Sequence, residues 1–157
     1  MNTGERNELL IKLRLVEMRM HNISATIFNN EKIEKVSREI VVYTEKALLD
    51  NGGDFTREIY ANIKERILEL GDIKVDPKKL YVAFKGKSNM CDIIIRKKYL
   101  AIFLNLKDGL LHDPENVAEK VKDIGHWGNG DYRINIDSFE KIDYLMTLIR
   151  QSYKINR

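Results

Sequence analysis

The apolar residues of this chain change their spacing at Gly71, and this change constrains the fold more than any other feature. Before Gly71 they recur every three or four residues, as they do along one face of an α-helix. After Gly71 they form short runs or alternate with polar residues, which is typical of β-strands joined by turns. Helices followed by a block of strands predict an α+β fold with an antiparallel sheet.

Three helices are predicted before Gly71. The first covers residues 3–20, the second covers residues 31–50, and the third runs from Asp54 or Thr56 to about Leu70. Asn51-Gly52-Gly53 separates the second helix from the third, because glycine readily takes the left-handed conformation that ends helices. We expect residues 1–30 to form a helical extension and residues 31–157 to form the α+β domain.

After Gly71, apolar runs predict a meander of about four to five strands. The runs cover residues 73–75, 80–84, 90–95, 100–106 and 132–136. Pro114 is expected to open a short helix that ends near Val121. Asp137 and Glu140 fit a capping box, which predicts a C-terminal helix packed on the sheet. The apolar stripe of that helix consists of Ile142, Leu145, Met146 and Ile149.

Composition favours a reducing compartment. The 157 residues include one cysteine, Cys91, so no disulfide can form within the chain, and Cys91 lies in an apolar run as a small buried residue would. No apolar run approaches the roughly 20 residues that a membrane-spanning helix needs. We therefore expect a cytoplasmic protein with no membrane partner.

Two basic turns are candidate nucleic-acid contacts. Residues 71–157 carry 16 Lys and Arg against 12 Asp and Glu, whereas residues 1–70 carry 11 against 12. The cations cluster in two predicted hairpins, as Lys85 and Lys87 and as Arg96, Lys97 and Lys98. Such turns suit the phosphates of DNA or RNA, with Tyr81, Phe84 and Tyr99 nearby for stacking. The alternative is ordinary solvated turns, in which lysines keep strand edges from pairing.

A glycine-rich segment is the second candidate site. It reads Gly125-His126-Trp127-Gly128-Asn129-Gly130-Asp131 and matches neither a Walker loop nor a dinucleotide fingerprint. Its backbone N–H groups could hold an anion, with His126 as acid, base or ligand. The alternative is a tight connection into the last strand, with Trp127 filling the edge of the core and Asn129-Gly130 making the turn.

Other chemistry is sparse, so we predict no catalytic residue, no metal site and no cofactor. The three histidines lack the spacing of metal ligands. The first helix has an apolar stripe that could be a seam with a second copy of the chain or a docking face for a partner. The alternative is that it packs on the chain's own core. The stripe consists of Leu9, Leu13, Val16 and Met20.

The C-terminal half resembles an uncharacterised bacterial and archaeal domain family that is often labelled "predicted transport protein". The resemblance covers roughly residues 36–155. It rests on residues 80–84, 93–95 and 100–106, on the GHWGNGD segment at 125–131 and on the closing LIRQSY sequence at 148–153. Members of that family are often attached to nuclease-like domains, which implies an accessory role near nucleic acid. A weaker similarity links the chain to the MmcQ/YjbR-like α+β proteins, which are suspected of binding DNA.

These observations predict a non-catalytic module that binds nucleic acid or assists a nuclease, with phosphates held by the basic hairpins. The alternative is a protein-interaction or dimerisation module that acts through its first helix.

Overall fold

A computed structural model describes residues 42–124 and 129–157. Residues Tyr43–Arg157 form one compact unit. The first helix with its apolar stripe, the expected boundary after residue 30, and Gly125 to Gly128 of the glycine-rich segment lie outside the described residues. Their structure and roles stay predictions.

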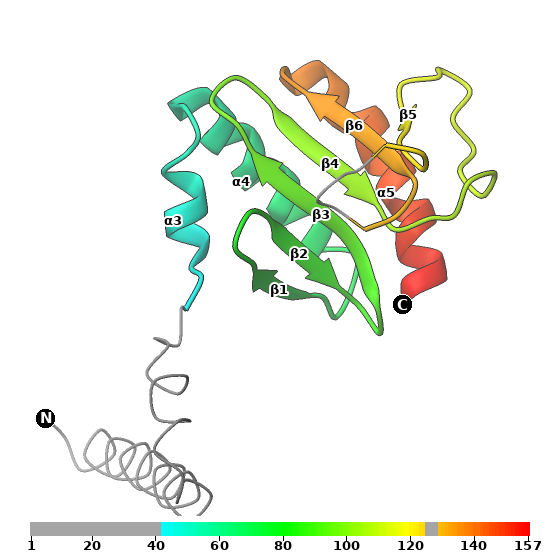
Figure 1. Ribbon diagram of the computed structural model, residues 1–157, viewed down its shortest axis with the longest axis horizontal. Helices are drawn as coiled ribbons and strands as arrows, with labels where there is room; N and C mark the ends of the chain where they lie inside the picture. The colour runs from blue at the N-terminus through cyan, green and yellow to red at the C-terminus, as the bar shows by residue number, and fades with distance from the viewer. Residues whose placement is uncertain (1–41, 125–128) are drawn as a thin grey trace, which may run out of the picture. The chain divides into compact units, whose positions relative to one another are not determined.

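Within the described residues, helices α3 and α4 precede the sheet (Figure 1). Helix α3 spans Glu45–Leu49 and helix α4 spans Asp54–Leu68. The helix expected over residues 31–50 is not continuous, because residues 42–44 are not helical, whereas residues 45–49 are. Thr44 is extended and its hydroxyl accepts a hydrogen bond from the Ala47 amide at 3.2 Å. A new helix therefore begins after Thr44, as threonine at an N-cap position favours.

The sheet has six strands, and all of its pairings are antiparallel. The strands are β1 (Lys74–Pro77), β2 (Val82–Lys85), β3 (Asn89–Ile95), β4 (Leu100–Leu104), β5 (Glu119–Lys120) and β6 (Tyr132–Ile136). Their order across the sheet is β1-β2-β3-β4-β6-β5, so the first four strands form a meander. The predicted α+β class is confirmed.

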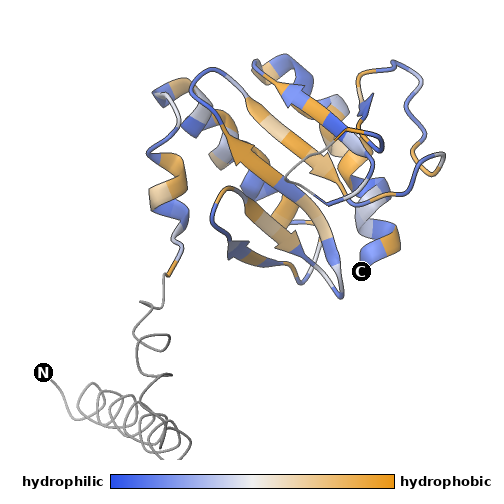
Figure 2. Cartoon of the chain, viewed as in Figure 1, coloured by the Kyte–Doolittle hydropathy of each residue, from blue (hydrophilic) through white to orange (hydrophobic). Residues whose placement is uncertain are grey.

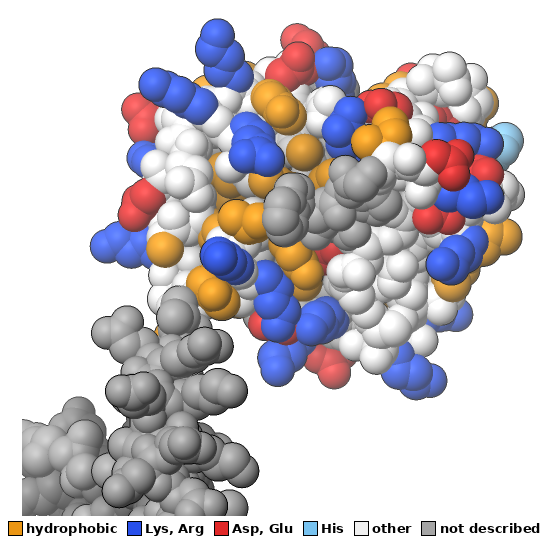
Figure 3. All heavy atoms as spheres, in the orientation of Figure 1, with side chains coloured by type: hydrophobic (Ala, Val, Ile, Leu, Met, Phe, Trp, Pro, Cys, Tyr) orange, Lys and Arg blue, Asp and Glu red, His pale blue; other side chains and the backbone are white. Residues whose placement is uncertain are grey.

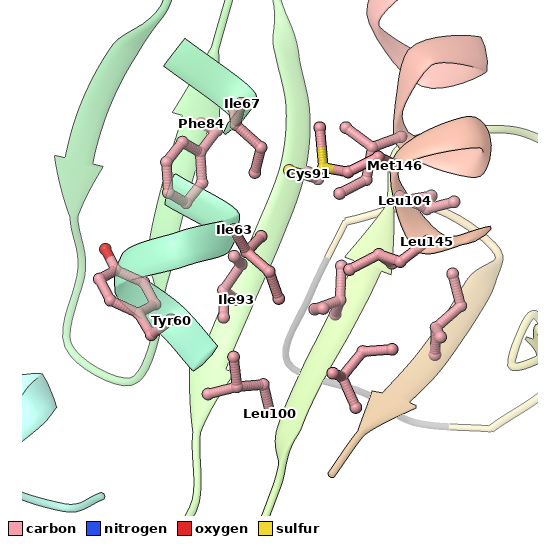
Figure 4. Packing of buried hydrophobic residues seen from close by; sticks show 14 of the residues in the cluster. Tyr60, Ile63, Ile67, Phe84, Cys91, Ile93, Leu100, Leu104, Leu145 and Met146 are labelled. Atoms are coloured by element: carbon pink, nitrogen blue, oxygen red, sulfur yellow. The ribbon is translucent and has the colours of Figure 1, made fainter. Parts of the chain in front are cut away.

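Helix α4 and the C-terminal helix α5 (Ile142–Asn156) cover the same face of the sheet (Figure 1). Ile63 and Ile67 of α4, together with Leu145 and Met146 of α5, point toward the strands (Figure 4). All four residues of the predicted α5 stripe are buried, which confirms that prediction. Cys91 lies in the same core, where burial raises the pKa of its thiol and keeps it protonated.

The two central strands are also covered on their second face. Every residue of β4 is buried, as are six of the seven residues of β3, and both strands are largely apolar (Figure 2). Alternation along a strand sends successive side chains to opposite faces. We call the face turned away from α4 and α5 the outer face. Its small apolar cluster consists of Ile94, Ala101, Phe103 and Val121, with Tyr81 packed against it.

Two local predictions are wrong. Residues 114–121 form no helix, because side chains hold this backbone in another path: Asp113 accepts hydrogen bonds from the Ala118 amide at 2.7 Å and from the Tyr144 hydroxyl at 2.6 Å. The Asp137 capping box does not form either. A 3₁₀ turn over Phe139–Lys141 precedes α5, and the Asp137 carboxylate pairs with Lys141 at 2.6 Å.

The buried ring of Phe84 gives a direct test of this packing. It is fully buried in the main core, so we expect Phe84→Ala to lower the free energy of unfolding by about 3–5 kcal/mol. Leu110→Ala serves as the control, because that side chain is 55% exposed and its loss should cost less than about 0.5 kcal/mol. Urea unfolding of the two variants measures both values. Equal losses would contradict the placement of Phe84.

Candidate nucleic-acid interface

The two basic hairpins lie at opposite ends of the sheet. Lys85 and Lys87 flank the turn that enters β3, whereas Arg96, Lys97 and Lys98 follow its last residue. A strand of seven residues spans about 20 Å, which separates the two groups by that length. The five cations therefore do not form one patch.

Lys85 is also occupied by an acid of its own chain. Its ammonium lies 2.5 Å from the Asp76 carboxylate, which also pairs with Lys78 at 2.8 Å. Hydrogen bonds from Lys78 and Lys85 lower the pKa of Asp76 to about 2. This carboxylate stays charged at neutral pH and neutralises much of the local positive charge.

A hollow of about 500 Å³ lies at the other end of the sheet, and we call it the basic pocket. It is formed by the loop between α3 and α4, the turn between β1 and β2, and the end of β3. Its cations are Lys79, Arg96 and Lys97, and none of them pairs with an acid among residues 42–124 and 129–157. The lining residues are Asn51, Lys79, Leu80, Ile94, Ile95, Arg96 and Lys97.

Backbone contacts shape the walls of the basic pocket. The Lys78 amide donates to the Tyr81 carbonyl at 2.8 Å, and the Arg96 amide donates to the Tyr99 carbonyl at 3.0 Å, which closes both turns. Gly53 brings the α3–α4 loop against the hairpin, since a Cβ atom there would lie 2.9 Å from the Lys97 carbonyl oxygen. A larger residue at this position would push the loop away from the hairpin.

Sequence reasoning missed Lys79 and Asn51 as members of this site. The signal for Lys79 was present, because Lys78 and Lys79 follow Pro77 in a turn between two strands. Asn51 could not be placed there, since only the fold brings the end of α3 beside β3. The suggestion that Phe84 stacks on bases is wrong because its ring is fully buried in the main core. Tyr99 is 38% exposed and Tyr81 is half-buried.

The described end of the glycine-rich segment is tied to the outer face. The backbone amide and side-chain amide of Asn129 both donate to the Asp92 carboxylate at 2.8 Å, and Asn89 donates to its other oxygen at 2.9 Å. Gly130 has a φ of 92°, and a Cβ atom there would lie 1.9 Å from the Leu104 carbonyl oxygen. Only glycine fits this close approach.

Asp131 continues the connection into β6. Its backbone amide donates to the Leu106 carbonyl at 3.0 Å, and its carboxylate accepts from the Asp108 amide at 2.8 Å. Residues 129–131 therefore use their polar groups to hold the chain in place. No group of three or more potential metal ligands occurs among the described residues, and no helix there could cross a membrane.

The chain matches a known family over most of its length. The family is the "Domain of unknown function (DUF5655)", and the match covers residues 44–156. The chain belongs to this family. The expected membership of an uncharacterised domain family is thus confirmed, whereas the attachment to nuclease-like domains and the similarity to MmcQ/YjbR-like proteins stay predictions.

A relative of this DUF5655 chain occurs in Haemophilus influenzae, where it is an uncharacterised protein. The two are 46% identical over 136 residues, which is 85% of this chain and 44% of the relative. The chain thus spans less than half the length of that relative. No solved structure gives a significant match to the chain.

The buried Asp92 predicts a distinct pH dependence of the DUF5655 domain. Burial raises its pKa, against the opposing effect of the hydrogen bonds from Asn89 and Asn129. Above the ordinary pKa of 3.8, the unfolded chain loses this proton before the folded chain does. Between the pKa of Asp92 in the unfolded chain and its higher pKa in the folded chain, the Asp92 contribution therefore makes folding less favourable as pH rises.

We expect the stability of the wild type relative to Asp92→Asn to fall as pH rises from about 4 toward neutrality. Urea unfolding of both proteins across this range measures the difference between their free energies of unfolding. The contributions of the other acids cancel in this difference. The exposed Asp123→Asn variant controls for the chemistry of the replacement. A difference that grows with pH would contradict the assigned direction of the Asp92 shift.

Proposed function

We propose that this DUF5655 domain is a non-catalytic module that binds the phosphates of nucleic acid through the basic pocket. The observation that carries the proposal is the set of exposed cations at one end of the sheet. Lys79, Arg96, Lys97 and Lys98 are all exposed, and none is neutralised by an acid among the described residues.

Unpaired cations close together repel one another, and a bound polyanion removes that repulsion. Each phosphate contact also releases counterions from the nucleic acid, so that binding is strong at low salt and weakens steeply as salt is added. Contacts of this type fix position on the strand without reading its sequence. No bond has to be made or broken by residues of the basic pocket.

The family resemblance supports an accessory role beside a nuclease. The domain would hold the strand while a separate domain or protein performs the chemistry. The length of the Haemophilus influenzae relative is compatible with this arrangement, because 44% of it is matched by the chain. Lys85 and Lys87 play a smaller part in this proposal, since they lie at the far end of β3 and Lys85 is paired with Asp76.

Charge reversal at the basic pocket tests the proposal. We expect the triple variant Lys79→Glu, Arg96→Glu, Lys97→Glu to bind labelled DNA or RNA about 100-fold more weakly at low salt. Its plot of log affinity against log salt should be shallower by about one unit for each phosphate that the variant no longer binds. Fluorescence anisotropy titrations at several salt concentrations measure both quantities.

The matched control is the triple variant Lys107→Glu, Lys122→Glu, Lys154→Glu, which reverses three other exposed lysines. It has the same net charge as the first variant, so general electrostatics are equal in the two. We expect it to retain most of the wild-type affinity. Equal weakening in both variants, or no binding by the wild type at low salt, would refute the basic pocket as the interface.

A further inference from the structure

Two tyrosines stand beside the basic pocket on the outer face of the sheet. The side chains of Leu100, Ile102 and Leu104 enter the main core. Tyr99 immediately precedes β4, and its carbonyl still pairs with the Arg96 amide, so continuing the alternation of β4 by one residue places Tyr99 on the side of Ala101. Tyr81 immediately precedes β2 and packs against the outer-face cluster that contains Ile94. The strand registers place Tyr81 beside Ile94 on the β2 side, whereas Ala101 lies beside Ile94 on the β4 side and Tyr99 lies two residues further toward the hairpin, opposite Arg96.

This arrangement leaves an apolar floor with a charged rim. Leu80, Ile94 and Ile95 supply the apolar lining of the basic pocket, and Lys79, Arg96 and Lys97 supply its cations. The space-filling view shows apolar side chains gathered on part of this face, with lysine and arginine around them (Figure 3). Leu80 is 40% exposed, so part of this lining is open to solvent.

The chemistry of that surface fits single-stranded nucleic acid better than a duplex. In a duplex the bases are stacked and paired, so their faces are hidden and only phosphates meet a protein surface of this kind. In a single strand the bases are free to stack on aromatic side chains while cations follow the backbone. The volume of about 500 Å³ also lies in the range of about 300–1,000 Å³ found for pockets that take small ligands.

We infer that the basic pocket binds single-stranded nucleic acid, with unpaired bases on Tyr81 and Tyr99 and the adjoining phosphates on Lys79, Arg96 and Lys97. The inference rests on the proposed function and adds the class of substrate to it. Asn51 belongs to the same lining, and an asparagine side chain has both donors and an acceptor for the edge of an unstacked base.

The test compares three labelled ligands of equal length: a thymidine homopolymer, an abasic strand with the same phosphates and no bases, and a DNA duplex. We expect the wild-type chain to bind the homopolymer at least fivefold more tightly than the abasic strand, since stacking of one base contributes about that much. The double variant Tyr81→Leu, Tyr99→Leu should bind both strands equally. Leucine keeps the apolar bulk and removes the aromatic face.

The control is Tyr153→Leu, which removes a half-buried tyrosine from α5 on the other side of the sheet. It should keep the wild-type preference for the homopolymer. Circular dichroism shows whether each variant is folded, and Tyr99→Ala alone, at the exposed hairpin, replaces the double variant if that one unfolds.

The results distinguish the single-strand inference from the proposed binding of phosphates. Equal affinity for all three ligands, or tighter binding of the duplex, overturns the single-strand inference and leaves phosphate binding intact. A homopolymer preference that survives both tyrosine variants overturns the assignment of the stacking residues. No binding of any ligand at low salt overturns the proposed function and this inference together.

Discussion

The burial of β3 and β4 beneath α4 and α5 is the constraint on which the rest of this domain depends. Ile93 and Ile102 face the helices. Because side chains alternate along a strand, the residues next to them in each strand must face the other side of the sheet. Asp92 and Ile94 must face the other way. A slip of one residue would bring the Asp92 carboxylate into the apolar core, which would cost several kcal/mol. The composition of the outer face therefore follows from the packing of the inner face.

The residues on the outer face differ between its two ends. Near the β2–β3 turn, Asp92 accepts hydrogen bonds from Asn129 and Asn89, so Asn129 is held against β3. Near the β3–β4 hairpin, the same face carries Ile94 and the two tyrosines. One half of the face is closed by the chain itself, and the other half borders the basic pocket.

Much of this fold follows from spacing in the sequence. The stripe of α5 and the strand over residues 132–136 are local patterns, and both were predicted correctly. The prediction of a helix after Pro114 was wrong because hydrogen bonds with Tyr144, which is distant along the chain, compete with helix formation there. The position of Phe84 in the core agrees with the spacing of the sequence, since Val82 and Phe84 are two residues apart and therefore face the same side of β2.

The candidate site was harder to predict for a geometrical reason. A hairpin sequence shows which residues lie at a turn, and it does not show which turns meet at the same end of a sheet. Lys87 and Lys97 look equivalent along the chain, yet β3 separates them by its whole length. Lys79 and Lys97 belong to different turns, yet both line the basic pocket. Only the register of β1, β2 and β3 brings them together.

The contrast between the two ends of the sheet gives the strongest argument for an external partner. At the β2–β3 end, several polar groups pair within the chain: Lys85 pairs with Asp76, and Asn156 accepts from the Ser88 hydroxyl at 2.7 Å and donates to the Asn105 carbonyl at 3.0 Å. At the β3–β4 end, the cations of the basic pocket have no acid beside them among the described residues. Clustered like charges lower the stability of the folded state. Under the proposed function, a bound polyanion would compensate for that cost, whereas a purely structural role would be better served by neutral side chains.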